Sequence, residues 1–477
     1  MNWVVQSIIV IFFVSIFALG ILGQRRTKGT ADYYIGGRSV NGFLIAFVYI
    51  TSMVSAGAMV GWISQAWQWG IYFIYSANAV TVAAFLCWIL LGRKLSALSK
   101  EQNYLTVPDF IEARYDSRTA RMIASLIILV FSVPLLVSQF TAIGKLLQLS
   151  TGMSYSYAVI GFGLVVFLYV TFGGYLAVIY TDVLQGFFLL VGVLVLFVSV
   201  FRNMPEPLNV IYPKVFPAGW VSFPTEGSVT TPGFLIAFVL LSFFGAFGSP
   251  NCIRAFYSMR DGRAYRQGLS ITMSIVVLLE IIIVMIGIYG KVFFPELDSA
   301  DNIVYYLIET IRSPLAAGIA LTAIAAAVMS TMDSLLIQCA SAVENDIFTR
   351  TLHIRLSEKK RLTVARLTVA VIGFICVVWS LRPPEYLALL MYPSWGVLGL
   401  SFAWVFYLGL YWKRFNKAGA VTAMITSVVV FTVWNALGNP YGIYHVQMAL
   451  AVSIPAALIA TWLTPPTAEE TLKKFFK

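Results

Sequence analysis

The sequence has few charged residues for its length. Only 11% of its 477 residues are Asp, Glu, Lys or Arg, whereas a soluble chain carries about 25%. This shortage leaves too little charge to cover a water-facing surface, and it excludes a soluble multidomain enzyme. The 71 aromatic residues, together with many Ile, Leu and Val residues, exclude a disordered chain as well.

Residues that serve metal, redox or hydrolytic chemistry are also scarce. The four cysteines lie far apart in apolar stretches and form no CxxC pair, which is typical of buried core positions. The only histidines, His353 and His445, have no partner at ligand spacing, which argues against zinc and haem. No GxxxxGK[ST] loop is present, and the serines near residue 330 have no histidine to act as a base. We therefore expect no enzyme.

The sequence is rich in long apolar runs. Because a hydrocarbon core of about 30 Å needs roughly 20 apolar residues per helix, we expect an all-α polytopic membrane protein with about thirteen spans. Their predicted positions are 3–23, 42–66, 70–92, 121–148, 154–178, 182–202, 232–256, 267–291, 313–343, 362–381, 386–411, 418–437 and 444–463. The first has no cleavage site after it and is predicted to be a retained helix.

The positions of Lys and Arg predict the orientation. With the N-terminus outside, 26 of the 32 basic residues fall in cytoplasmic segments, as the positive-inside rule requires. We therefore expect an N-out, C-in protein of the cell membrane, with its basic face against anionic lipid. No basic run is interleaved with aromatic residues, so no nucleic-acid partner is expected.

Polar and small residues inside the spans are the candidates for function, because each polar group is costly there. Small residues at Ser55–Gly61 can unwind the second span, and Pro250 within Gly245–Asn251 breaks the seventh. Close helix packing is the alternative explanation of the small residues. Two equivalent breaks are expected where transporters bind their cargo, if spans 2–6 and 7–11 form an inverted repeat. Asp182 is predicted to open the sixth span, where a helix N-cap is the alternative.

The ninth span has oxygen-bearing residues on one face. Ala327, Ser330 and Thr331 have i, i+3 and i+4 spacing, and Ser330, Asp333 and Ser334 repeat it one turn further along. A stripe of oxygen ligands suits a hard cation such as Na⁺. Hydroxyls bonded to carbonyls of the preceding turn are the alternative, which explains Ser330 and Thr331 but leaves the carboxylate of Asp333 unexplained.

In this order and spacing, these motifs resemble those of the sodium:solute symporter family over essentially the full chain. The matching landmarks are Asp32–Ser39, Leu105–Phe110, Phe172–Tyr175 with Thr181 and Asp182, Ala326–Thr331 with Asp333 and Ser334, and Gly409–Trp412 with Lys417–Ala420. The resemblance implies a leucine-transporter-type core of five-plus-five inverted helices. It also implies sodium-coupled uptake of a small organic solute by alternating access.

The resemblance further implies one transporter domain over residues 1–477, with no obligate protein partner, in a bacterial inner or plasma membrane. Its expected parts are an extra helix at 3–23, a first repeat at 42–202, a second repeat at 232–411 and two extra helices at 418–463.

Two sodium sites follow from the same resemblance. The principal site matches the carbonyls of Ala56, Met59 and Ala327 with the hydroxyls of Ser330 and Thr331. A second site, present in some relatives, matches Asp182, Ser330, Asp333 and Ser334. Asp333 stands where the family often has another hydroxyl, which could strengthen the site or change its ion preference.

The solute is expected between the two breaks. The residues expected near it are Ser55, Val60, Gln65, Phe247, Ser249, Asn251, Tyr392 and Trp395. Glu280, in the middle of the eighth span, is a further residue expected near the solute, and a protonated core carboxyl is its alternative. The pattern is most similar to pantothenate symporters, through Leu381–Glu385, and then to proline symporters, through Ala326–Thr331. A solute sensor without coupled flux is the alternative of another class, and the intact sodium motif argues against it.

Overall fold

The computed structural model describes residues 3–55, 57–215, 231–382 and 388–476. Ala56 of the expected principal sodium site, and residues 383–385 of the Leu381–Glu385 stretch, lie outside these ranges. Within them the chain is helical, and a single bridge between Val40 and Met259 is the only strand-like pairing.

Long apolar helices make up most of the described chain, and eleven of its segments can cross a membrane by length and composition. The main helices are α1 (Trp3–Arg26), α5 (Phe73–Leu86), α8 (Arg118–Thr151), α9 (Tyr155–Arg202), α11 (Pro232–Phe247), α13 (Gly262–Phe293), α15 (Pro314–Ser341), α16 (Glu358–Ser380), α17 (Ala388–Tyr411), α18 (Lys417–Ala436) and α19 (His445–Leu463). Two features account for the difference between these eleven segments and the thirteen predicted spans: helix α9 folds back on itself, and the second predicted span is broken.

Helix α9 folds back on itself at Gly174. Its 48 residues would extend about 72 Å as one straight helix, more than twice the thickness of a hydrocarbon core. Gly174 has φ 62°, in the left-handed region that favours glycine. On α1, Phe13 contacts Phe162 before this turn, while its neighbour Phe12 contacts Phe188 after it. Both arms of α9 therefore reach the same level of α1 and form two crossings.

The turn in α9 corrects the predicted boundary between the fifth and sixth spans. The sequence places it at residues 178–182, so that Asp182 would open the sixth span, whereas the chain reverses at Gly174. Asp182 lies eight residues further on, in the helix interior, and is fully buried. It is therefore no helix cap at the membrane edge.

Both predicted helix breaks are present. The second span divides into α3 (Gly42–Met53), which at 12 residues is too short to cross alone, then η2 (Gly57–Trp62) and α4 (Ile63–Trp69). Gly70, with φ 60°, ends this span. The seventh span divides at Gly248 and Ser249 into α11 and α12 (Pro250–Tyr257), because Pro250 has no amide proton for a continuous helix.

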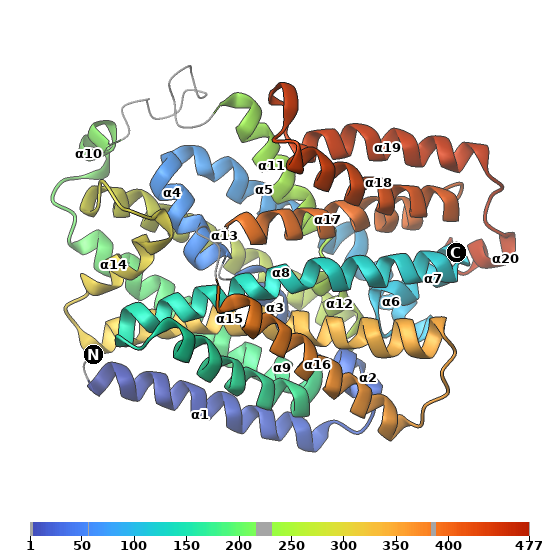
Figure 1. Cartoon of the computed structure of the whole chain (residues 1–477), viewed down its shortest axis with the longest axis horizontal. Helices are drawn as coiled ribbons and strands as arrows, with labels where there is room; N and C mark the ends of the chain where they lie inside the picture. The colour runs from blue at the N-terminus through green and yellow to red at the C-terminus, as the bar shows by residue number, and fades with distance from the viewer. Residues whose placement is uncertain (1–2, 56, 216–230, 383–387, 477) are drawn as a thin grey trace.

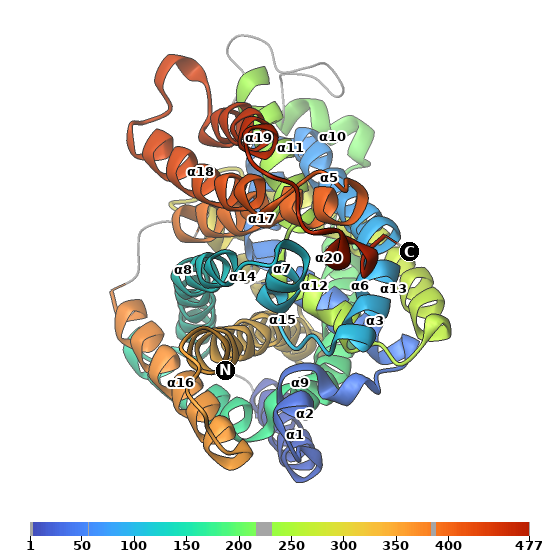
Figure 2. The same ribbon diagram turned by 90° about the vertical axis from the view of Figure 1, so that its right-hand side faces the viewer.

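The helices form a bundle whose long axis is horizontal in Figure 1. The start of α1 and the last helix, α20 (Glu469–Lys473), lie at opposite ends of it, as an odd number of crossings requires. In the end-on view of Figure 2, α15 lies near the middle, α1 and α16 lie at one edge, and α18 and α19 lie at the other. In the most apolar 18-residue stretch of the segment Pro314–Thr351, 78% of the residues are buried, which is the highest share among the eleven segments. The polar stripe therefore lies on the central helix.

Ion pairs join helices at the end of the bundle that the sequence predicts to be cytoplasmic. Helix α7 (Val107–Tyr115) begins at a capping box formed by Thr106 and Asp109, with Pro108 in its first turn. Asp109 is buried. Its burial disfavours the charged form, but the Arg121 guanidinium, 2.7 Å away, and the Leu105 amide hold the pKa of this carboxyl below its usual range. Arg121 also pairs with Asp346 at 3.0 Å, beyond the end of α15.

Candidate functional site

The hydroxyls predicted to bind sodium lie where α15 meets the broken second span. Ser330 Oγ donates to the carbonyl of Thr51 in α3 at 3.0 Å and to that of Ala327 at 3.1 Å. Thr331 Oγ1 donates to the Ala327 carbonyl at 3.3 Å. Bonding to the preceding turn is therefore present, but it uses only the protons. The lone pairs of both oxygens remain available to a cation.

Two of the carbonyl ligands expected at the principal sodium site come from η2 and α15. Met59 is buried in η2, which contacts α15, and Ala327 is buried on α15 itself. Thr331 lines the cavity next to the break, together with Ser55 and Gly57. Ala327, Ser330 and Thr331 thus lie together on α15 where it meets α3 and η2, Met59 lies on η2, and Ala56 is outside the described residues.

The expected second sodium site is a buried polar cluster between α9 and α15. Ser334 Oγ is hydrogen-bonded to Ser52 Oγ of α3 at 3.2 Å. Asp333 accepts a hydrogen bond from Tyr169. Neither oxygen of Asp182 has a hydrogen-bond partner within the described ranges. The Thr51 hydroxyl of α3 donates to the carbonyls of Phe47 and Val48. Both oxygens of Asp182 and Oδ2 of Asp333 thus have no hydrogen-bond partner among the described residues. A buried cluster with such free carboxyl oxygens can bind a cation.

Three residues of this cluster are not predicted from the sequence. Tyr169 comes from the first arm of α9, Gln185 from the second arm, and Arg254 from α12. Gln185 follows Asp182 by one helical turn, so its position in an apolar span could have signalled it. Arg254 follows the break by one turn and offered a similar signal. Tyr169 gives no such sign, because aromatic residues are common in every span.

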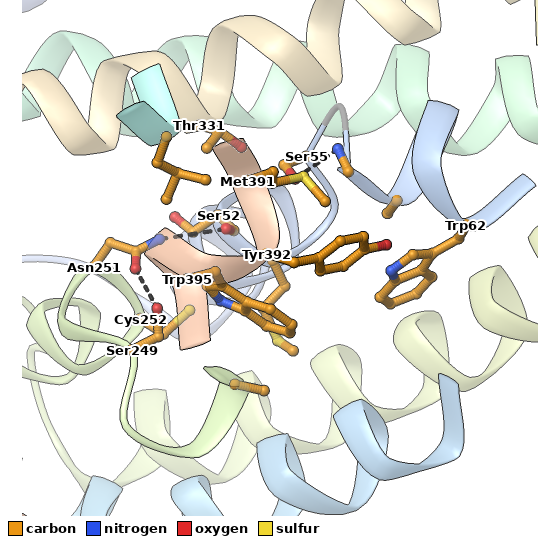
Figure 3. Close-up of a pocket in the computed structure, with 15 residues that line it drawn as sticks. Ser52, Ser55, Trp62, Ser249, Asn251, Cys252, Thr331, Met391, Tyr392 and Trp395 are labelled. Carbon is orange, nitrogen blue, oxygen red and sulfur yellow. Dashed lines mark hydrogen bonds between the residues drawn. The ribbon is translucent and has the colours of Figure 1, made fainter. Parts of the chain in front are cut away.

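A central cavity of about 50 Å³ lies between the two helix breaks (Figure 3). Five of the residues expected near the solute line it, namely Ser55, Ser249, Asn251, Tyr392 and Trp395. Asn251 lies at the start of α12 and donates to the carbonyl of Ser52 at 3.4 Å, and Ser249 donates to Asn251 at 2.5 Å. These bonds join the break in the seventh span to the break in the second.

An outer vestibule of about 570 Å³ lies next to the central cavity. Val60 and Gln65 line the vestibule, and Tyr392 and Met391 line both spaces. The Tyr392 hydroxyl donates to Gln65 Oε1 at 2.8 Å, which links α17 to α4 between the two spaces. The larger space therefore lies on the α4 side of the break in the second span, which is the outer side in the predicted N-out orientation, and the Tyr392–Gln65 hydrogen bond lies at its boundary with the central cavity.

Two residues expected near the solute lie elsewhere. Phe247 stacks on Phe243, with their ring centroids 5.8 Å apart, and neither residue lines the central cavity or the vestibule. Glu280 faces Thr81 of α5, which donates a hydrogen bond to it, and it too is absent from both linings. The structure brings neither residue to the central cavity.

Comparison with known proteins identifies the family of the chain. The model of the sodium:solute symporter family matches residues 33–427. The chain is 30% identical to the sodium/pantothenate symporter of Escherichia coli (strain K12), over 95% of this chain and 94% of that protein. It is 26% identical to a sodium/proline symporter of Staphylococcus aureus (strain JH9), over 97% and 93%.

A solved structure shares the fold. A Na⁺-coupled sialic acid symporter in a substrate-bound outward-open state superposes with a TM-score of 0.83 at 20% identity, over 98% of this chain and 99% of that one. This likeness confirms the predicted leucine-transporter-type fold. The chain belongs to the sodium:solute symporter family, and it is therefore a membrane transporter rather than an enzyme.

Proposed function

We propose that this protein imports a small organic carboxylate together with sodium, with pantothenate as the first candidate and proline as the second. The observation that carries the proposal is the junction of α15 with the broken second span, where Ser330 and Thr331 present oxygens beside an unwound backbone. A dehydrated cation at this junction would bridge two helices that lie on different parts of the bundle.

The principal sodium ion would be held by the carbonyls of Ala56, Met59 and Ala327 and by the hydroxyls of Ser330 and Thr331. A second ion would be held by Asp182, Ser330, Asp333 and Ser334. The unpartnered oxygens of Asp182 and the single hydrogen bond to Asp333 support this second site. Both ions would enter from the outer vestibule, before the inner ion pairs separate.

The central cavity favours an anionic solute. No Lys or Arg is among the residues that line it, but the N-terminus of α12 begins there at Pro250. Broken helices in transporters direct such N-termini, with their partial positive charge, at the anionic group of the substrate. The bound sodium would add charge of the same sign. Pantothenate and proline both carry a carboxylate, and relatives named for each match nearly the whole chain.

Uptake into proteoliposomes tests the proposal. We expect radiolabelled pantothenate to accumulate with an inward sodium gradient and not with choline, and an inside-negative potential to accelerate it, because one charge crossing 100 mV contributes about 2.3 kcal/mol. Proline, a monocarboxylate and a sugar complete the panel. Equal rates in sodium and choline would contradict sodium coupling. Saturable binding of a panel member without any flux would favour a sensor.

A further inference from the structure

Arg254 occupies an unusual place for a permanent cation. It lies on α12, the inner half of the broken seventh span, and is 2% exposed. Its Nη2 donates to the carbonyl of Ser334 on α15 at 3.0 Å, and its guanidinium lies 4.6 Å from the centre of the Tyr175 ring on α9. Arg254 therefore joins one broken helix to the two helices that carry the proposed second sodium site.

The guanidinium is only partly satisfied by these contacts. Its Nε and Nη1 have no hydrogen-bond partner within the described part of the chain, and neither do the two oxygens of Asp182. On α9, Tyr175 precedes Asp182 by seven residues, which is about two helical turns and therefore the same face of the helix. On α15, Ser334 follows Asp333 directly. A buried cation with free N–H groups thus lies near a buried carboxylate with free oxygens.

After each round of uptake, a sodium symporter must return to its outward-facing state with its binding sites empty. After sodium leaves, a buried carboxylate without a partner is costly, because a charge taken out of water needs a counter-charge. We propose that Arg254 is this counter-charge: in the empty protein, its guanidinium takes the place of sodium beside Asp182. This inference rests on the proposed function, since it assumes that sodium binds at Asp182.

The position of Arg254 on α12 fits this role. Its side chain carries five N–H donors on a long stem, and it already reaches the carbonyl of Ser334, the residue directly after Asp333 on α15. When sodium binds, like charges repel, and the guanidinium is released from Asp182. When sodium leaves towards the cytoplasm, the guanidinium returns, and the empty site can close.

Comparison of two transport modes tests the proposal. Net uptake requires the empty protein to return, whereas exchange of labelled for unlabelled solute at saturating sodium on both sides does not. With radiolabelled pantothenate as the probe, we expect Arg254→Gln to lower net uptake at least about tenfold relative to exchange. Arg254→Lys keeps the charge and should recover most of the ratio. An equal loss in both modes would overturn the proposal.

Two further variants separate pairing from folding. Asp182→Asn combined with Arg254→Gln removes both charges and should return the ratio of net uptake to exchange towards that of wild type. Arg114→Gln is the matched control, because Arg114 is equally buried but, among the described residues, its hydrogen bonds go to the carbonyls of Gly409, Trp412 and Phe415. It should leave the ratio unchanged. A ratio that stays low in the double variant would exclude Asp182 as the partner.

A second readout needs no solute. Cys252 is a native thiol that lines the central cavity. In sodium-free membrane vesicles of each orientation, a membrane-impermeant maleimide should label Cys252 from the cytoplasmic side at least about fivefold faster, relative to the outer side, in Arg254→Gln than in wild type. Added sodium should remove this difference. An unchanged ratio would overturn the role of Arg254, whereas labelling as expected without pantothenate transport would overturn only the proposed solute.

Discussion

The junction at α15 and the central cavity lie side by side and share Thr331, but they are built differently. At the junction, the oxygens come largely from successive turns of one buried helix, at Ser330, Thr331 and Ser334. The central cavity is lined from several helices that are far apart in the sequence, and aromatic residues such as Trp62, Tyr392 and Trp395 make up much of its wall (Figure 3).

The difference shows which features a membrane transporter can vary. A cation site needs several oxygens at fixed separations, and the i, i+3 and i+4 spacing of one helix supplies them rigidly. A solute cavity needs a shape and a few directional groups, which many combinations of side chains can provide. Sodium dependence and solute affinity should therefore respond to different substitutions.

The largest effect is expected at Thr331. Thr331→Ala leaves a dehydrated ion short of one ligand, and should raise the sodium concentration for half-maximal uptake at least about tenfold, or about 1.4 kcal/mol. Thr331→Ser keeps the oxygen and should remain near wild type. Sodium titrations of uptake measure both. If Ala and Ser give the same sodium dependence, the hydroxyl is no ligand and the contrast between the two regions is lost.

The carboxylates of the second site should give the next largest effect. Asp182→Asn or Asp333→Asn should lower the sodium Hill coefficient by up to about one, because the coefficient is limited by the number of coupled sites. Solute binding should persist at high sodium. The Hill coefficient from uptake at varied sodium is the measurement. An unchanged coefficient together with reduced protein stability would assign both residues to packing.

A smaller effect is expected at Tyr392, and it should change the solute dependence of uptake instead of the sodium dependence. Tyr392→Phe removes the hydrogen bond to Gln65 between the cavity and the vestibule, a loss of about 1 kcal/mol. The solute concentration for half-maximal uptake should rise about fivefold, while the sodium dependence stays the same. Kinetics at saturating sodium test the first part and a sodium titration the second. A shift in the sodium dependence alone would show that the two regions are not separable.

The smallest effect is expected at Glu280, which belongs to neither region. Glu280→Gln keeps an oxygen that can accept the hydrogen bond from Thr81, so sodium and solute dependence should stay within about twofold of wild type. Glu280→Ala leaves the Thr81 hydroxyl without this partner, and should cost about 1–3 kcal/mol of stability. Thermal unfolding in detergent measures that cost. A large transport defect in Glu280→Gln with normal stability would place Glu280 in the transport mechanism.

The sequence by itself determined the features that depend on neighbouring residues. Apolar runs of about 20 residues mark the spans, and Pro250 and the small residues at Ser55–Gly61 mark both helix breaks. The spacing of Ser330 and Asp333 places their oxygens one turn apart on one helix. Each of these signals lies within a few turns of one helix, where hydropathy and periodicity act directly.

Only the tertiary structure decided how distant residues meet. The reversal at Gly174, rather than at 178–182, moved Asp182 from a predicted helix start into the core. Arg254 and Tyr169 reached the cluster around Asp182 and Asp333 from other helices. The reason is that apolar helices in a membrane present similar surfaces to lipid and to each other, so the pairing of their faces depends on close packing and buried hydrogen bonds, which the pattern along one helix does not specify.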